Sequence, residues 1–441
     1  MIWHITRYLV SFALPSFYKK IEGKNMDRFQ VKGPVIIAMN HPNAFMDPVC
    51  ITWVSYPTRV RYMARGDAFK PGIANFLLGQ LGVVPIFRMR DGGREGLQKN
   101  DESYRVVNKL LKRNAKIIIF AEGLCIQERR LRPLKKGVAR MVFGAYEHLN
   151  NKDLVVVPVG VNYSAPSKFR SKLFYNAGKP IRISDLAGAH KEHPARTQKQ
   201  FLELLDSRMR ELVTHIKNKE NDVLVVELEE MVMKDWLKRK NLKNALENEF
   251  EVSRHLTELI NNLDELEPEK TANLRQNSHD YHMLLRKNKL RDWIIDPLNR
   301  KKISYNNLIF RYILTLFGLP IYLLGWLAAY LPYKLSVMAT KKVVKRNKEF
   351  YASMAVGLGT FIFILVFLAW FFLIYAFSPT IICPLVSLVG LLLASRFALL
   401  FHFFMLKTNG IARAVKNPNL YKTLSEKRLE IMQVVNGLTN F

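Results

Sequence analysis

The stretch that decides the fold is Pro34-Val35-Ile36-Ile37-Ala38-Met39, followed directly by Asn40-His41-Pro42-Asn43-Ala44-Phe45-Met46-Asp47-Pro48. The first six residues are apolar without interruption and predict a short strand buried on both faces. The proline and asparagine after the histidine are turn residues, so we expect the chain to turn sharply and enter a helix. His41 and Asp47 favour either a base with its orienting carboxylate or two unrelated caps, one of the strand and one of the helix.

Short apolar strands alternate with helical stretches from Val31 to about Ile183. Further strands are expected over 58–64, 82–88, 116–120 and 154–160, with an edge strand within 175–183. This alternation predicts an α/β fold with a mostly parallel sheet flanked by helices. In such sheets ligands bind at the carboxyl ends of the strands. His41, Arg88 and Glu122 each lie at or just past the end of a strand, which brings three polar groups to one edge.

Composition narrows the classes of partner. Lys and Arg exceed Asp and Glu, 67 against 37, and the formal charge of +30 indicates an anionic partner: nucleic acid, an anionic membrane surface or a phosphate-bearing substrate. No basic stripe with interleaved aromatics supports nucleic acid. The three cysteines are far apart and predict neither a disulfide framework nor a cysteine zinc site. The pair His190 and His193 lacks further ligands, so no metal site is expected.

Outside the predicted sheet, four regions differ in character. Residues 1–20 predict an amphipathic helix in the membrane interface, with a helix packed on its own domain as the alternative. Residues 191–305 predict a charged helical region with a polar linker at 264–275. Residues 306–407 predict a membrane region, because the segments 308–332, 353–377 and 381–406 are long enough to cross a bilayer of about 30 Å. Residues 408–441 predict a basic C-terminal tail.

Four blocks in the predicted sheet resemble the glycerolipid (lysophosphatidic acid/glycerol-3-phosphate) acyltransferase family. They are the pair His41…Asp47, the strand Gly82-Val83-Val84-Pro85-Ile86-Phe87-Arg88, the turn Phe120-Ala121-Glu122-Gly123 and the strand Val157-Pro158-Val159. The resemblance covers roughly residues 20 to 190 and identifies 21–190 as an acyltransferase catalytic domain. It implies the glycerolipid acyltransferase fold for this part of the chain, which a charged helical region and C-terminal membrane helices follow.

The blocks also depart from the family pattern. Five residues separate His41 from Asp47, where the family usually has four, and this spacing resembles the fungal-type glycerol-3-phosphate acyltransferases. The extra residue has to be absorbed in the turn that follows the histidine. Ala121 stands where the family has proline, and Leu124 and Cys125 replace a small hydroxyl and a polar residue. These changes bear on the acceptor contacts of that loop and leave Glu122 in place.

The resemblance implies a role for each block. His41 would be the general base and Asp47 its orienter, and direct attack by an acceptor hydroxyl needs no protein nucleophile, in agreement with the absence of a G-x-S-x-G sequence. Cys50 therefore reads as a small buried apolar residue.

The substrate-binding residues implied by the resemblance each have a structural alternative. Arg88 would hold a phosphate, or would pair with a nearby carboxylate. Glu122 and Gly123 would shape the acceptor site. Lys136 would touch phosphate or lie in a solvated basic loop, and Pro158 would line the acyl path or belong only to the core.

The resemblance predicts a membrane-bound acyltransferase of phospholipid synthesis. It would move a fatty acyl group from a thioester, acyl-CoA or acyl-carrier protein, to glycerol-3-phosphate or 1-acyl-glycerol-3-phosphate, with no cofactor. The alternatives are another lysolipid or non-phosphate acceptor, and a non-catalytic lipid-binding protein of this fold. The basic loop 333–350 is expected on the cytoplasmic side, as is the catalytic domain. Segment 308–332 would then begin and end on one side, and is predicted to be re-entrant or broken.

Overall fold

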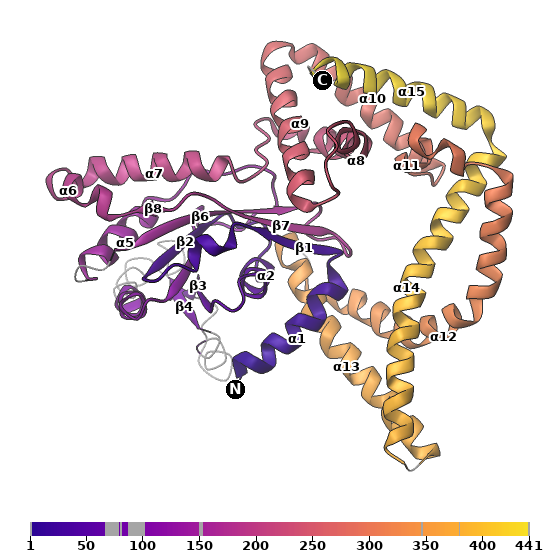
Figure 1. The fold of residues 1–441 in the computed structure, drawn as a ribbon, viewed down its shortest axis with the longest axis horizontal. Helices are drawn as coiled ribbons and strands as arrows, with labels where there is room; N and C mark the ends of the chain where they lie inside the picture. Colours follow the sequence, from indigo (N-terminus) through magenta and orange to yellow (C-terminus); the bar gives the residue numbers. More distant parts are fainter. Residues whose placement is uncertain are drawn as a thin grey trace. The chain divides into compact units, whose positions relative to one another are not determined.

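The computed structural model describes residues 2–66, 79, 82–86, 102–149, 153–344, 347–378 and 380–439 (Figure 1). The chain forms two compact units. The first comprises Met1–His215 and Val344–Val356, and the second comprises Ile216–Val343 and Gly357–Phe441.

The first unit is built on one eight-stranded sheet. The strands follow the order β1-β7-β6-β2-β5-β3-β4, and β8 pairs with β6. The five strands from β6 to β4 are parallel, whereas β7 and β8 run antiparallel to β6. This confirms the predicted mostly parallel sheet. The strand bounds are Lys20–Lys24, Val35–Met39, Val60–Arg65, Val83–Ile86, Lys116–Phe120, Val155–Tyr163, Lys172–Ala177 and Ile181–Arg182, for β1 to β8 in turn.

Helices cover both faces of this sheet. Alternate residues of β2 enter different cores: Ile36 and Ala38 pack with helices α5 and α7, and Ile37 and Met39 pack with α1 and α2. Both faces are therefore buried, which is why the strand is apolar at every position. The helices of this unit are α1 (Ile2–Phe17), η1 (Met26–Phe29), α2 (Met46–Val54), α5 (Lys136–Glu147), α6 (Ser184–Glu192) and α7 (Pro194–Arg210), and residues 102–112 are also helical.

The sheet unit extends to His215, past the boundary expected at 190. Helix α7 carries Phe201, Leu205 and Met209, each fully buried in the core that also contains β2 and β5. Their spacing of four residues places them on one helix face, so this charged helix covers the sheet.

The second unit contains a helical bundle with its own core. Its helices are α8 (Asp222–Arg239), η3 (Lys219–Asn221), α9 (Leu246–Leu266), α10 (Pro268–Lys287), α11 (Asp292–Ile295), η4 (Pro297–Lys302) and α15 (Pro418–Gly437). Only Glu267 separates α9 from α10, so the linker expected at 264–275 is wrong: its polar residues lie on helix surfaces.

The basic tail expected over 408–441 is likewise wrong for most of its length. Helix α15 buries Leu424, Ile431 and Val435 in the bundle core. In the same apolar stripe lies Arg428, whose Nε is 2.9 Å from the Asp292 carboxylate. A charged residue within the stripe hides the helical periodicity in the sequence. In the fold, the buried ion pair with Asp292 compensates the charge of Arg428.

Three helices are long and apolar enough to cross a membrane: α12 (Tyr305–Val343), α13 (Tyr351–Phe377, extended by η5, Lys348–Phe350) and α14 (Ile382–Lys416). Segment 308–332 is not broken, since it lies within the continuous helix α12, which contains Pro320 and Pro332 and curves along its length (Figure 1). Gly325 permits close packing of α12 on α14, because a Cβ there would clash with the Ala394 carbonyl oxygen.

Candidate active site

The turn after β2 is fixed to the neighbouring strand β6 by Asn40. Its amide nitrogen donates to the Val161 carbonyl at 3.0 Å, and its amide oxygen accepts from the Val161 N–H at 2.7 Å. The turn then closes through the Asn43 carbonyl, which accepts from the N–H of Met46 at 2.8 Å and of Asp47 at 3.2 Å. Helix α2 therefore begins at a defined distance from the end of β2.

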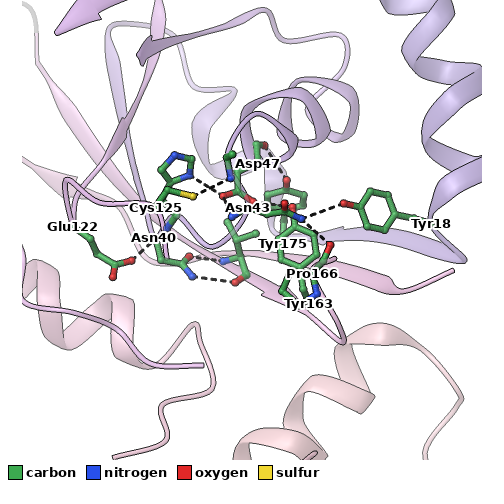
Figure 2. A network of polar contacts seen from close by, with 12 residues as sticks. Tyr18, Asn40, Asn43, Asp47, Glu122, Cys125, Tyr163, Pro166 and Tyr175 are labelled. Atoms are coloured by element: carbon green, nitrogen blue, oxygen red, sulfur yellow. Dashed lines mark hydrogen bonds and ion pairs between the residues drawn. The ribbon is translucent and has the colours of Figure 1, made fainter. Parts of the chain in front are cut away.

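This turn brings His41 and Asp47 together. Nδ1 of His41 lies 2.8 Å from Oδ2 of Asp47. Figure 2 shows Asp47 with Asn43, Tyr163 and Tyr175 around it. The extra residue between them is absorbed by the turn, in which Ala44 has a φ of 27°, uncommon for a residue other than glycine. The Ala44 N–H donates to Sγ of Cys125 at 3.0 Å, which helps to hold this conformation.

Asp47 is fully buried, and its carboxylate is held by three hydrogen-bond donors. Oδ2 accepts from His41 and from the Asn43 N–H at 2.8 Å, and Oδ1 accepts from the Tyr163 hydroxyl at 2.7 Å. The Tyr175 hydroxyl donates to the Asp47 carbonyl at 3.0 Å. Burial, followed by the negative charge of Asp47, raises the pKa of Tyr163 well above its ordinary value, so the phenol stays protonated and donates.

The network fixes the tautomer of His41. Because Asp47 offers only acceptors, Nδ1 of the histidine carries the proton and Nε2 presents its lone pair. The ring stacks on Phe120, with centroids 3.7 Å apart and planes at 16°, and the side chain is 17% exposed. An imidazole held on one side and reachable on the other has the arrangement of a general base.

Glu122 lies beside the same turn. Oε1 accepts from the His41 N–H at 3.3 Å and Oε2 from the Arg132 N–H at 3.1 Å. Burial raises the pKa of this carboxyl, and the two backbone donors oppose that rise. Gly123 follows with a φ of +65°, and the stem of Lys135 lies 3.0 Å from where its Cβ would be, so the position favours glycine.

The other predicted site residues are less closely grouped. Arg88 lies outside the described residues. Lys136 is the exposed first residue of α5. Pro158 pairs with Ala38 in the sheet, and its ring lies beside Gly178. The structure thus brings His41, Asp47 and Glu122 together, and it gives Pro158 a place in the core.

Sequence reasoning missed the polar residues that support the pair. Tyr163 and Tyr175 come from β6 and β7, distant in the chain from Asp47. The one available signal was that Tyr163 ends a strand at the carboxyl edge of the sheet, where ligands bind. Among the residues that the structure describes, no group of three or more His, Cys, Asp or Glu side chains is placed to hold a metal ion.

The loop after Gly123 is strongly basic. Arg132 pairs with Glu128 at 2.8 Å, Nε of Arg130 lies 3.5 Å from the same carboxylate, and Arg129 donates to the Ser164 carbonyl at 3.1 Å. The Glu128 carboxylate is therefore paired with two guanidinium groups, those of Arg130 and Arg132. The excess of positive charge suits an anionic ligand.

A buried aspartate beside a partly exposed histidine at the carboxyl edge of a parallel sheet can supply a general base for acyl transfer or hydrolysis. A family model described as acyltransferase matches residues 20–162. Glycerol-3-phosphate O-acyltransferases 1 and 2 of Saccharomyces cerevisiae are 37% and 31% identical over 111 residues, 25% of this chain and 15% of each of those proteins. Residues 20–162 are therefore similar to the acyltransferase family.

The matched part is a small share of this chain and of each Saccharomyces protein. The chain spans less than a fifth of the length of the two Saccharomyces proteins. A crystal structure of the 1-acyl-sn-glycerophosphate (LPA) acyltransferase of Thermotoga maritima is similar at a TM-score of 0.33 and 16% identity, covering 46% of this chain and 78% of that chain.

Proposed function

We propose that the protein is a membrane-bound O-acyltransferase of phospholipid synthesis. It moves a fatty acyl group from acyl-CoA or acyl-carrier protein to a hydroxyl of glycerol-3-phosphate or 1-acyl-glycerol-3-phosphate. The observation that carries the proposal is the contact of 2.8 Å between His41 and a buried Asp47 inside the acyltransferase domain.

His41 acts as the base in this proposal. Its Nε2 takes the proton of the acceptor hydroxyl while that oxygen attacks the thioester carbonyl. The tetrahedral intermediate collapses with cleavage of the carbon–sulfur bond, and the imidazolium returns the proton to the departing thiolate. Asp47 stabilises the imidazolium in between, and the three donors on its carboxylate keep that carboxylate in place.

Glu122 is a positioning residue in this mechanism. Both of its oxygens accept backbone N–H groups, one of them that of His41 itself, so it ties the histidine to the loop that begins at Gly123. Arg88, the proposed phosphate clamp, rests on the family resemblance. The arginines of the loop after Gly123 add positive charge that favours a phosphate-bearing acceptor.

The catalytic domain lies on the cytoplasmic face in this proposal, because the acyl donors are cytoplasmic. No long apolar segment occurs between the sheet and Tyr305, so the first end of α12 stays on the side of the sheet. The residues after the other end, Val344–Val356, belong to the sheet unit. Both ends of α12 therefore lie on one side of the membrane in this proposal, so α12 is not a simple span, while α13 and α14 form a membrane hairpin.

The proposal is tested by assaying membranes that contain the protein with both acceptors and both donors. Transfer to glycerol-3-phosphate or its 1-acyl derivative supports it. Transfer only to acceptors without phosphate, or no transfer from any thioester, refutes it. Cysteine accessibility at position 347, past the end of α12, and at position 191 in helix α6 of the sheet unit tests the topology. Labelling from opposite sides of the membrane contradicts it.

A further inference from the structure

A segment outside the matched acyltransferase region forms part of the sheet unit. Residues 344–356, which include the start of helix α13, belong to this unit. Ala352 is fully buried in the core that also contains Met46 and Cys50 of helix α2. The first turn of α13 therefore enters the same core as the helix that carries Asp47.

The same segment contacts the catalytic turn directly. The Phe350 ring meets Phe45 edge-on, with centroids 5.7 Å apart and planes at 67°. The Lys348 carbonyl accepts from the amide nitrogen of Gln127 at 3.2 Å and from the Ser167 hydroxyl at 3.3 Å. These contacts attach the start of α13 to the turn after His41 and to the loops that carry Gln127 and Ser167.

Phe45 is placed unusually for a large apolar residue. It lies two positions before Asp47, and 39% of its surface is exposed even with Phe350 against it. Beyond Phe350 the chain continues as α13, which carries no charge from Met354 to Phe377. The two rings thus lie between the catalytic turn and the start of a helix suited to a bilayer.

We infer that Phe350, together with Phe45, contacts the acyl chain of a substrate as the chain passes between the bilayer and the catalytic turn, and that Phe350 sets the preference for chain length. This inference rests on the proposed function. Phe45 offers apolar surface in the turn between His41 and Asp47, Phe350 extends that surface, and each methylene packed on the two rings adds to binding. The chain is either that of the thioester donor or that of a lysolipid acceptor.

The test compares Phe350→Ala with Phe361→Ala, which removes an exposed ring farther along the same helix. Full-length protein in detergent is assayed in two arms. One arm varies the donor, palmitoyl-CoA against butyryl-CoA, with glycerol-3-phosphate. The other arm varies the acceptor, 1-palmitoyl against 1-hexanoyl glycerol-3-phosphate, with butyryl-CoA.

We expect Phe350→Ala to lower kcat/KM for the long chain by about tenfold in one arm, through KM, which corresponds to lost contact with one or two methylenes. The short chain should change less than about twofold, as should every substrate with Phe361→Ala. The affected arm identifies the donor or the acceptor as the source of the chain.

An equal loss for short and long chains in the variant, or no loss, overturns the inference. If Phe350→Ala lowers the Tm strongly, Phe350→Leu and Phe45→Leu replace it in the test, since leucine keeps apolar volume. The same ratio is then compared, kcat/KM for the long chain over kcat/KM for the short chain. Wild-type protein that transfers no acyl group contradicts the proposed function instead.

Discussion

Replacing Asp47 by asparagine tests the catalytic pair with little change of shape. If the amide oxygen takes the place of Oδ2, it accepts from His41 Nδ1 and from the Asn43 N–H, as the carboxylate does. The amide nitrogen then faces the Tyr163 hydroxyl, which can rotate and accept. Asp47→Asn should therefore fold and keep the histidine tautomer, while it removes the negative charge.

The size of the effect follows from that charge. Imidazolium and carboxylate charges about 4 Å apart attract by about 4 kcal/mol at an effective dielectric constant of about 20. A hydrogen bond to a charged group contributes about 1.5–3 kcal/mol. Taking about 3 kcal/mol as the loss in the transition state, we expect kcat to fall about a hundredfold, with KM nearly unchanged.

Initial rates with a saturating thioester and both acceptors measure this fall, and a thermal melt in the same detergent checks the fold. Phe361→Ala, a change on an exposed face of α13, is the matched control. If Asp47→Asn keeps more than about a third of wild-type kcat with an unchanged Tm, the carboxylate does not stabilise a charged histidine, and the mechanism is wrong.

Three further predictions concern the groups around the pair. Tyr163→Phe removes the donor to Oδ1 and should lower kcat about tenfold and the Tm measurably, whereas an unchanged rate would show that Asp47 needs no such donor. Glu122→Gln leaves one backbone N–H without an acceptor and should lower the Tm. Burial raises the pKa of Glu122, so the stability of the wild type declines as the pH rises through that pKa. The difference in Tm between the wild type and Glu122→Gln should therefore be largest in acid, and a difference that grows toward neutral pH contradicts this. Cys125→Ser should keep at least a third of the activity, since the hydroxyl can also accept from Ala44 and burial raises the thiol pKa; a dead variant would point to a role for sulfur.

The sequence predicts the sheet well because its central strands are apolar at every position. It misses β1, whose residues Lys20-Ile21-Glu22-Gly23-Lys24 are mostly polar, because an edge strand is buried less. The helix α15 escapes prediction since Arg428 lies in its apolar stripe and is neutralised only by Asp292 from a distant segment.

The candidate site divides in the same way. His41 and Asp47 are close in the chain, so their spacing and the turn between them predict a pair. Tyr163 reaches Asp47 only because β6 lies next to β2, and Phe350 reaches Phe45 only because the start of α13 returns to the sheet unit. Contacts of this kind depend on strand order and on the return of the chain, which local patterns do not contain.

The most direct test of the central claim is the rate of acyl transfer by His41→Ala against wild type, with glycerol-3-phosphate and 1-acyl-glycerol-3-phosphate as acceptors and acyl-CoA or acyl-carrier protein as donor. Loss of a general base should lower kcat about 10²- to 10⁴-fold for whichever acceptor the wild type uses. Full activity of His41→Ala would contradict the account, because no other described group is placed to take the proton beside Asp47.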